Sequence, residues 1–163
     1  MRVIVAKEPP IKVIYLELIM LFERLHRLFL EVVGIELDRM SVKDLSNVQA
    51  LVLYNIGVNQ ITVGEITTRG YYLGSNVSYN LKKMVDNGYI IQKTSPSDKR
   101  SVYVSLSTKG KQIYKKIEGV LEEHVKNLPH NHFSANTLKT FLSQSRQLET
   151  FLSQVLMHNV RVF

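Results

Sequence analysis

Residues 76–89 read Asn-Val-Ser-Tyr-Asn-Leu-Lys-Lys-Met-Val-Asp-Asn-Gly-Tyr. Apolar side chains recur in this stretch at helical spacing, at Val77, Leu81, Met84 and Val85. We therefore expect an amphipathic helix that begins at Gly74 or Ser75. It should stop at Asn87-Gly88, because asparagine and glycine readily adopt the conformation that ends a helix. The opposite face of this helix is polar and carries two lysines.

A shorter helix is expected just before this one. Thr62-Val-Gly-Glu65 has the spacing of a capping box, in which the threonine oxygen accepts the third amide and the glutamate reaches back. Ile66 and Val77 are eleven residues apart, and a tight turn at Leu73-Gly74 would join the two helices. This spacing is typical of a helix-turn-helix, although Arg69-Gly-Tyr-Tyr72 brings unusually bulky side chains into the turn.

Two strands are predicted after the helix pair. Residues 90–94 and 102–106 read as strands, and the second alternates apolar and polar side chains. Between them, Ser95-Pro-Ser-Asp-Lys-Arg-Ser101 reads as a polar turn with Lys99 and Arg100 at its tip. A hairpin in this place would be the wing of a winged helix.

Longer amphipathic helices are expected on both sides of this centre. Pro9-Pro10 opens the first, since proline is tolerated at a helix start, and Gly34 is expected to end it. Two more are expected, one that Ser107 or Thr108 caps and Pro129 ends, and one that begins at Ser134 or Asn136. The apolar face of the first helix is too wide for one partner, which predicts that it packs between its own domain and another subunit.

The predicted fold class is mainly α, within the α+β class. It is a winged helix-turn-helix with long helices that form a dimerisation lobe. A helix capped by Asp44 or Ser46 and followed by Gly57 would open the central lobe. Residues 46–106 would form this winged lobe, whereas residues 1–45 and 107–163 would form the helical dimerisation lobe.

The composition fits a small basic protein. The chain of 163 residues has a net charge of +7 and no cysteine. The basic surplus is zero in residues 1–59, +4 in 60–110 (7 basic against 3 acidic) and +3 in 111–163 (7 against 4). An anionic partner would explain this surplus, and so would surface solubility. No targeting or membrane segment is predicted, and a cytoplasmic location is expected.

The polar helix face and the wing tip are the candidates for binding nucleic acid. The major groove admits one helix, where serine and asparagine can bond base edges, tyrosine can reach a phosphate or a thymine methyl, and lysines can contact phosphates. Arginine on an extended loop can enter a narrow minor groove. The candidates are Ser75, Asn76, Ser78, Tyr79, Lys82 and Lys83 on the helix, and Lys99 and Arg100 on the loop. A solvated helix face and a soluble turn tip are the structural alternatives.

The chain resembles winged-helix transcription regulators of the MarR family over nearly its whole length. Three stretches carry the resemblance: residues 76–89, Ser97-Asp-Lys-Arg-Ser101 and Val104-Ser-Leu-Ser-Thr-Lys-Gly110. Within the family, the LdtR type is a further hypothesis. The resemblance implies an obligate homodimer, joined through the first and the last two helices, that binds palindromic double-stranded DNA. It assigns base reading to Ser75, Asn76, Ser78 and Tyr79 and the minor groove to Arg100, which Asp98 would orient through a charge-assisted hydrogen bond.

The resemblance also implies regulation by a ligand. Members of the family often bind small aromatic or phenolic effectors in a cleft between the two lobes. The branch that senses oxidants uses a cysteine, and this chain has none. Candidates for the effector pocket supply charge, soft packing or aromatic surface: Arg24, Arg27, Met40, Tyr54 and Tyr72. Ordinary packing or surface positions explain each of them at least as well.

Other classes of function are less well supported. The sequence has no phosphate-cradling glycine loop and no serine elbow, so no catalytic residue, enzyme activity or cofactor is predicted. His130 and His132 lack the further ligands of a metal site, so no metal is expected. A non-specific architectural DNA-binding protein and a winged-helix protein-interaction module are the alternatives to a sequence-specific regulator.

Overall fold

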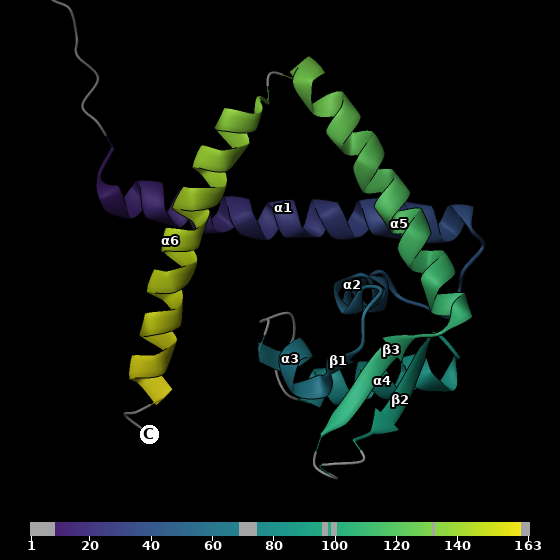
Figure 1. Cartoon of the computed structure of the whole chain (residues 1–163). Helices are drawn as coiled ribbons and strands as arrows, with labels where there is room; N and C mark the ends of the chain where they lie inside the picture. The colour runs from purple at the N-terminus through teal and green to yellow at the C-terminus, as the bar shows by residue number, and fades with distance from the viewer. Residues whose placement is uncertain (1–8, 69–74, 96–97, 99–100, 132, 161–163) are drawn as a thin grey trace, which may run out of the picture. The chain divides into compact units, whose positions relative to one another are not determined.

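The chain is mainly α-helical with one small sheet, which confirms the predicted fold class (Figure 1). The computed structural model describes residues 9–68, 75–95, 98, 101–131 and 133–160. The elements in chain order are α1 (Ile11–Arg39), α2 (Asn47–Ile56), β1 (Ile61–Thr62), α3 (Val63–Thr68), α4 (Ser75–Asp86), β2 (Ile90–Thr94), β3 (Val102–Leu106), α5 (Thr108–Asn127), the 3-10 helix η1 (Leu128–Asn131) and α6 (Ala135–Val160). They form two compact units, Met1–Glu118 and Gly119–Phe163, and α5 contributes residues to both.

The prediction that Gly34 ends the first helix is wrong, because α1 continues past it. Val33 and Leu37, on either side of the glycine, are the two buried side chains of α1. Their packing holds the helix together through a residue that costs about 1 kcal/mol in a helix interior. The chain turns at Ser41, which has a left-handed φ of 56°, and the Val42 amide donates to the Leu37 carbonyl 2.9 Å away.

The core of the first unit is built around α2. Ser46 caps this helix as predicted, since its hydroxyl accepts the Gln49 amide at 3.2 Å and the Gln49 side chain accepts the Ser46 amide at 3.0 Å. Gly57, with a φ of 69°, follows the end of the helix. The buried side chains of the core include Ala50, Leu51, Val52, Leu53 and Ile56 of α2, Ile66 of α3, Val77, Leu81 and Met84 of α4, Ile61, Ile90, Val104 and Leu106 of the sheet, and Ile113 and Ile117 of α5.

The sheet has three antiparallel strands in the order β1-β3-β2. Strands β2 and β3 span the predicted residues, with Ile90 opposite Leu106 and Thr94 opposite Val102. Strand β1 was not predicted, because two residues are too few to show an alternating pattern. Its pairing of Ile61 with Val104 joins segments far apart in the sequence.

Helix α3 begins in the predicted capping box. Thr62 Oγ1 accepts the Glu65 amide at 3.1 Å, and Glu65 Oε2 accepts the Thr62 amide at 2.6 Å. The predicted turn at Leu73-Gly74 and the bulky residues 69–72 lie outside the described residues. The two helices that this turn would join, α3 and α4, are both present.

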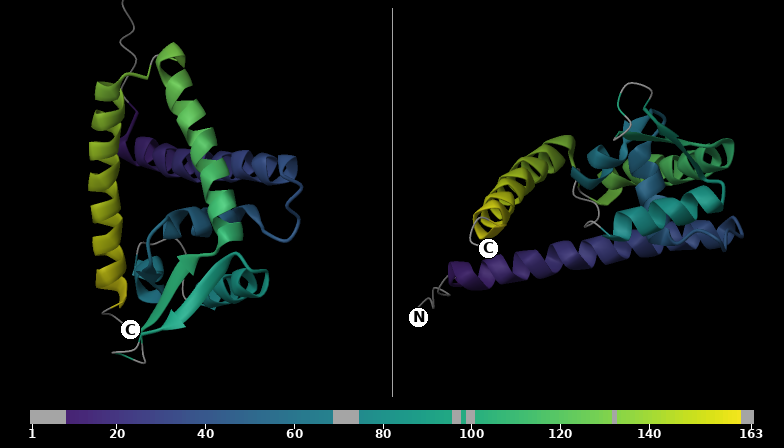
Figure 2. Two further views of the ribbon diagram at one scale, coloured as in Figure 1. Left: turned by 45° about the vertical axis from the view of Figure 1, so that its right-hand side comes forward. Right: turned by 90° about the horizontal axis from the view of Figure 1, so that it is seen from below.

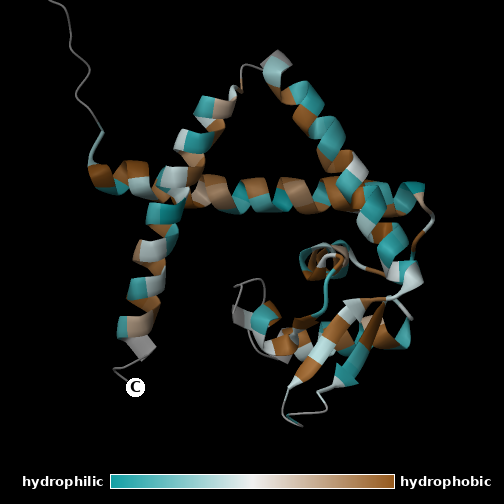
Figure 3. Cartoon of the chain, viewed as in Figure 1, coloured by the Kyte–Doolittle hydropathy of each residue, from teal (hydrophilic) through white to brown (hydrophobic). Residues whose placement is uncertain are grey.

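The long helices leave apolar side chains uncovered. Figure 2 shows α2, α3, α4 and the sheet gathered beside the C-terminal part of α1, and Figure 3 shows how apolar the rest of α1 is. Exposed apolar side chains of α1 include Ile11, Leu16, Met20, Leu25 and Leu28. Those of α6, in the second unit, include Phe141, Leu142, Phe151, Leu156 and Met157. Exposed apolar surface of this extent marks an interaction site.

The end of α5 and the start of α6 agree with the prediction. Helix α5 stops before Pro129, and Ser134 caps α6 by accepting the Thr137 amide at 3.1 Å. Among the described residues, no helix combines the length and the apolar character needed to cross a membrane. The predicted division into a lobe of residues 46–106 and a lobe of residues 1–45 and 107–163 stays a prediction.

Candidate nucleic-acid interface

Helix α4 has one buried and one exposed face. The buried side chains, each at most 3% exposed, are Val77, Leu81 and Met84. The exposed polar side chains are Ser78, Tyr79, Lys82, Lys83 and Asp86. Ser75 and Asn76 belong to the first turn of α4, but their side chains lie outside the described part of the chain. Four of the six predicted helix residues therefore form one accessible polar surface.

A buried amide fixes α4 against α2. Gln49 is 3% exposed, and its Nε2 donates to Asn80 Oδ1 on α4, 3.1 Å away. The same side chain completes the capping box with Ser46. Gln49 was not among the predicted site residues, although serine followed by glutamine three residues later is a capping signal. Because one side chain serves both purposes, the start of α2 and the inner face of α4 are held in one arrangement.

Helix α4 ends at the predicted Asn87 and Gly88. Gly88 has a φ of 74°, and its amide donates to the Val85 carbonyl at 2.9 Å. The Tyr89 amide donates to the Met84 carbonyl at 2.8 Å, which completes a Schellman motif. Tyr89 itself is fully buried, so the end of α4 is joined to the core.

The loop between β2 and β3 is closed by hydrogen bonds among three residues. The Ser95 amide donates to the Ser101 carbonyl at 2.8 Å, and the Ser101 amide donates to the Asp98 carbonyl at 2.9 Å. The Asp98 amide donates to Ser95 Oγ at 3.3 Å, and its carboxylate accepts the Ser101 hydroxyl at 2.7 Å. Lys99 and Arg100 lie outside the described residues, so the bond expected between Asp98 and Arg100 stays a prediction.

The predicted effector residues are spread along the chain. Arg24 and Arg27 are exposed on α1, whereas Met40 follows the end of that helix. At 1.5 Å per residue, Arg27 and Met40 are separated by about 20 Å along the helix axis. Tyr54 lies on α2, and Tyr72 lies outside the described residues. A pocket formed by these residues stays a prediction.

Tyr54 has a partner that the sequence did not indicate. Its ring stacks on that of Tyr114 of α5, with centroids 5.2 Å apart and planes inclined by 16°. The Tyr114 hydroxyl donates to Glu118 at 3.0 Å, and this bond raises the pKa of the phenol. Next along α2, the amide nitrogen of Asn55 is buried without a hydrogen-bond partner among the described residues. Such a donor is a position where an oxygen of a ligand could bind.

Two open hollows of about 450 Å³ each lie on the described surface. The first is lined by Thr62, Val63, Gly64, Gln92, Ser101 and Val102. The second follows α6 and is lined by Lys139, Leu142, Ser143, Arg146, Gln147 and Thr150. Neither contains a predicted effector residue. The described residues also hold no group of three histidine, aspartate or glutamate side chains placed to bind a metal ion.

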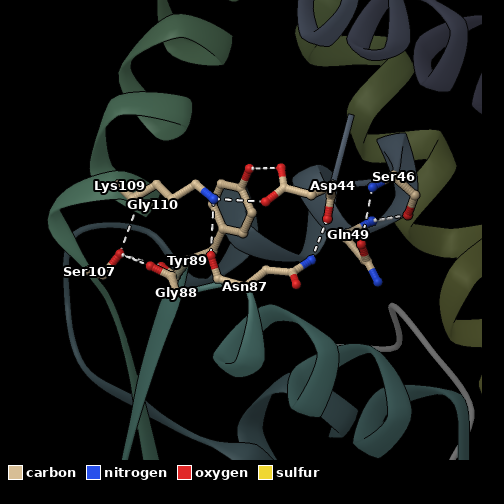
Figure 4. A network of polar contacts seen from close by, with 9 residues as sticks. All are labelled: Asp44, Ser46, Gln49, Asn87, Gly88, Tyr89, Ser107, Lys109 and Gly110. Atoms are coloured by element: carbon tan, nitrogen blue, oxygen red, sulfur yellow. Dashed lines mark hydrogen bonds and ion pairs between the residues drawn. The ribbon is translucent and has the colours of Figure 1, made fainter. Parts of the chain in front are cut away.

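A polar network joins the end of α4 to the start of α5 (Figure 4). The Tyr89 hydroxyl donates to the Asp44 carboxylate. Lys109 Nζ lies 2.8 Å from Asp44 Oδ2, 3.0 Å from the Asn87 carbonyl oxygen and 3.9 Å from the centroid of the Tyr89 ring. The hydrogen bonds from Lys109 and Tyr89 lower the pKa of Asp44, and Asp44 in turn raises the pKa of Lys109. Burial, followed by the bond to Asp44, raises the pKa of Tyr89.

The first turn of α5 lies directly against the backbone of Tyr89. The Ser107 hydroxyl donates to the Gly88 carbonyl at 2.6 Å and accepts the Gly110 amide at 3.0 Å. A Cβ at Gly110 would lie 2.1 Å from the Tyr89 carbonyl oxygen, so only glycine fits there. The residues of the stretch Leu106-Ser-Thr-Lys-Gly110 therefore have structural roles. Ser107 caps α5, and Gly110 lets the first turn of α5 pack against the Tyr89 carbonyl.

These elements define a winged helix-turn-helix protein, in which α3 and α4 are the helix pair and β2 and β3 form the wing. A sequence model of the MarR family matches residues 43–101. The exopolysaccharide II synthesis transcriptional activator ExpG of Rhizobium meliloti (strain 1021) is 36% identical over 137 residues, which cover 84% of this chain and 71% of ExpG. The chain belongs to the MarR family of transcription regulators.

Solved structures share the fold at lower sequence identity. FabT of Streptococcus pneumoniae, in complex with DNA, is 21% identical with a TM-score of 0.62, over 83% of this chain and 97% of FabT. MarR of Staphylococcus aureus, in complex with salicylate and kanamycin, is 20% identical with a TM-score of 0.68, over 87% of this chain and 94% of that one. These similarities confirm the winged-helix prediction, whereas the LdtR type stays a prediction.

Proposed function

We propose that this protein is a homodimeric transcription regulator that recognises a palindromic operator in double-stranded DNA. The accessible polar face of α4 is the observation that supports the proposal most directly. Its apolar side is buried in the core, while its outer side offers hydroxyl, phenol and ammonium groups. A single helix of this kind fits the major groove of B-form DNA. We expect such a regulator to act in the cytoplasm.

Within α4, we assign different tasks to its two ends. The N-terminal residues Ser75, Asn76, Ser78 and Tyr79 would read base edges, because the first turns of a recognition helix reach deepest into the groove. Lys82 and Lys83 follow one turn later and would contact phosphates, which position the protein without specifying sequence. Lys99 and Arg100 of the wing would add contacts in the minor groove.

The dimer would be formed by the uncovered apolar side chains of the long helices. Exposed leucines and aromatic residues lie along α1 and α6, two of the three helices that the resemblance assigns to the interface. A two-fold axis through this interface would place two copies of α4 about 34 Å apart, one helical turn of DNA. Both copies could then bind the two halves of a palindrome at once.

A small aromatic ligand is proposed to control DNA binding. The stacked rings of Tyr54 and Tyr114 support an aromatic ligand. The buried amide nitrogen of Asn55, which has no hydrogen-bond partner in the part of the chain that the structure describes, supports an oxygen acceptor on that ligand. MarR of Staphylococcus aureus has been solved with salicylate, which makes salicylate a suitable first probe. The ligand would change DNA affinity only if it binds the DNA-free arrangement more tightly.

Binding-site selection from randomised duplexes tests the proposed function. The wild-type chain should enrich a palindrome. Lys82→Ala should weaken binding to all duplexes alike and reduce the slope of log affinity against log salt by about one unit. Lys115→Ala, which removes an exposed lysine from α5, is the matched control and should leave the slope unchanged. Arg100→Ala should weaken binding most where the flanking sequence is rich in A·T pairs.

The alternatives give different results in the same experiment. An architectural DNA-binding protein would show salt-dependent affinity without enriching a palindrome. A protein-interaction module would bind no duplex, and neither Asn76→Ala nor Arg100→Ala would change that. If the enriched duplex binds equally well with and without salicylate and a panel of related phenols, the ligand switch is excluded.

A further inference from the structure

We propose that Asp44 and Lys109 are positioning residues, which contribute to fixing the direction of α5 relative to α4 and thereby the half-site spacing that the dimer prefers. The inference rests on the proposed function, since it concerns how two recognition helices are held apart. We call the ion pair between these two side chains the Asp44–Lys109 bridge. Neither residue belongs to the proposed DNA contacts.

The bridge joins three segments that are distant in the sequence. Asp44 precedes α2, Asn87 is the residue after α4, and Lys109 is the second residue of α5. The Lys109 ammonium donates to the Asp44 carboxylate at 2.8 Å and to the Asn87 carbonyl at 3.0 Å. The Asn87 side-chain amide in turn donates to the Asp44 carbonyl. Figure 4 shows Lys109 lying between Asp44 and the turn at the end of α4.

Further contacts hold the first turns of α5. The backbone of Gly110 lies against the Tyr89 carbonyl so closely that a Cβ would come within 2.1 Å of the oxygen. Ile113 and Ile117 are buried, and the Tyr114 ring stacks on that of Tyr54. The long side chain of Lys109 reaches from the first turn to Asp44 and to the Asn87 carbonyl, and it thereby adds a constraint on the direction of α5 relative to the end of α4.

Small tilts at this position have large consequences. With 20 residues, α5 is about 30 Å long, so a tilt of about 10° at its first turn moves its far end by about 5 Å. One base step along DNA is about 3.4 Å. If α5 helps to form the dimer, a tilt of this size would change the preferred half-site spacing by one to two base pairs. The displacement of about 5 Å, divided by about 3.4 Å per base step, corresponds to about one and a half steps.

Because the Asp44–Lys109 bridge is exposed, its positioning role can be tested separately from any contribution to the free energy of unfolding. The side chains of Lys109 and Asp44 are 47% and 48% exposed. Ion pairs at such positions add little to the free energy of unfolding, because solvent screens them. The capping bonds of Ser107 do not involve the Lys109 side chain. Methionine keeps an unbranched side chain beside the Tyr89 ring, so a Lys109→Met chain should fold.

The first test measures the direction of α5 without DNA. The chain lacks cysteine, so Asp86→Cys and Glu122→Cys, both exposed, place one spin label on α4 and one on α5. Labelled chain is diluted with unlabelled chain, and the distance between the two labels is measured by pulsed electron paramagnetic resonance. Lys109→Met and Asp44→Asn should each broaden or shift the distance distribution. Lys109→Arg, which keeps the positive charge, should give the distance distribution of the wild-type side chain.

The second test measures the consequence for DNA. Duplexes that carry the enriched half-sites at the preferred spacing, and at one base pair more or less, are titrated with each variant. Lys109→Met and Asp44→Asn should each reduce the discrimination between spacings by about two- to fivefold, the range expected for an exposed ion pair. Lys115→Ala should not change the discrimination.

The two tests separate the inference from the function on which it rests. An unchanged distance distribution in both folded variants overturns the positioning role. Unchanged discrimination between spacings, together with a changed distance distribution, overturns the link to DNA spacing. A wild-type chain that enriches no palindrome contradicts the proposed function and therefore also the link to spacing, while the label distances still decide the positioning role.

Discussion

Gly110 shows how one added carbon atom, the Cβ of any other residue, would destabilise this fold. A Cβ at this position would lie 2.1 Å from the carbonyl oxygen of Tyr89, and that oxygen belongs to the backbone of the residue that closes α4. Gly110→Ala should therefore lower the free energy of unfolding by at least about 2 kcal/mol, as overpacking of a tight contact does. Urea denaturation followed by circular dichroism measures the change.

Gly119 provides the matched control for this prediction on the same helix. A Cβ at Gly119 meets nothing within 4 Å. Gly119→Ala should therefore raise the free energy of unfolding by about 0.5–1 kcal/mol, because alanine favours the helix. Equal urea midpoints for the two variants would contradict the steric argument at Gly110.

The Asp44 carboxylate predicts a pH dependence of stability. Hydrogen bonds from Lys109 and Tyr89 lower its pKa below the ordinary 3.8. The unfolded chain therefore binds this proton at a higher pH than the folded chain does. The stabilisation is present above about pH 4 and is lost as the pH falls through the lower pKa of the folded state. Asp44→Asn should thus make the free energy of unfolding depend less steeply on pH between about pH 4 and pH 3. Parallel curves for the variant and the wild type would contradict this account.

At the scale of elements, Gln49 connects α2 and α4. Its buried side chain accepts the Ser46 amide and donates to Asn80. Gln49→Ala should lower the free energy of unfolding by about 1–3 kcal/mol, because buried polar groups lose their partners. The same change should lower operator affinity, since α4 loses a contact that fixes its orientation.

A glutamine without such contacts serves as the control. Gln112 is exposed on α5, and Gln112→Ala should change the free energy of unfolding by less than about 0.5 kcal/mol. Thermal melts of both variants, together with titration of the enriched duplex, make the comparison. Full operator affinity in a folded Gln49→Ala chain would show that Gln49 does not orient α4.

At the scale of the whole molecule, the uncovered apolar side chains predict how the subunits assemble. Leu16 of α1 is 51% exposed and Leu142 of α6 is also 51% exposed. Leu16→Glu and Leu142→Glu should each shift the protein from dimer to monomer, because a dimer interface would have to bury the new charge. Sedimentation equilibrium measures the shift.

Lys93→Glu tests whether any new carboxylate has this effect. Lys93 is exposed on β2, which is not among the helices assigned to the interface. This variant should sediment as the wild type does. Dimers of undiminished stability in both leucine variants would exclude these surfaces from the interface.

Much of this molecule could be predicted from short-range signals. The helix cap at Ser46, one of two predicted positions, the capping box at Thr62, the end of α4 at Gly88 and the strands β2 and β3 all appear as predicted. Each depends on residues a few positions apart, whose interactions survive in any environment that lets the segment fold. The exposed polar face of α4 followed from the same helical periodicity.

The tertiary structure alone decided the contacts that hold these segments in place. Gln49 and Asn80 are 31 residues apart, and Asp44 and Lys109 are 65 residues apart. Helix α1 continues through Gly34, because Val33 and Leu37 on either side of it are buried in the core. Such contacts have no local pattern, since they depend on which surfaces meet once the core has packed. The amino-acid order therefore determined the helices, the strands and the polar surface, whereas packing determined the orientation of that surface.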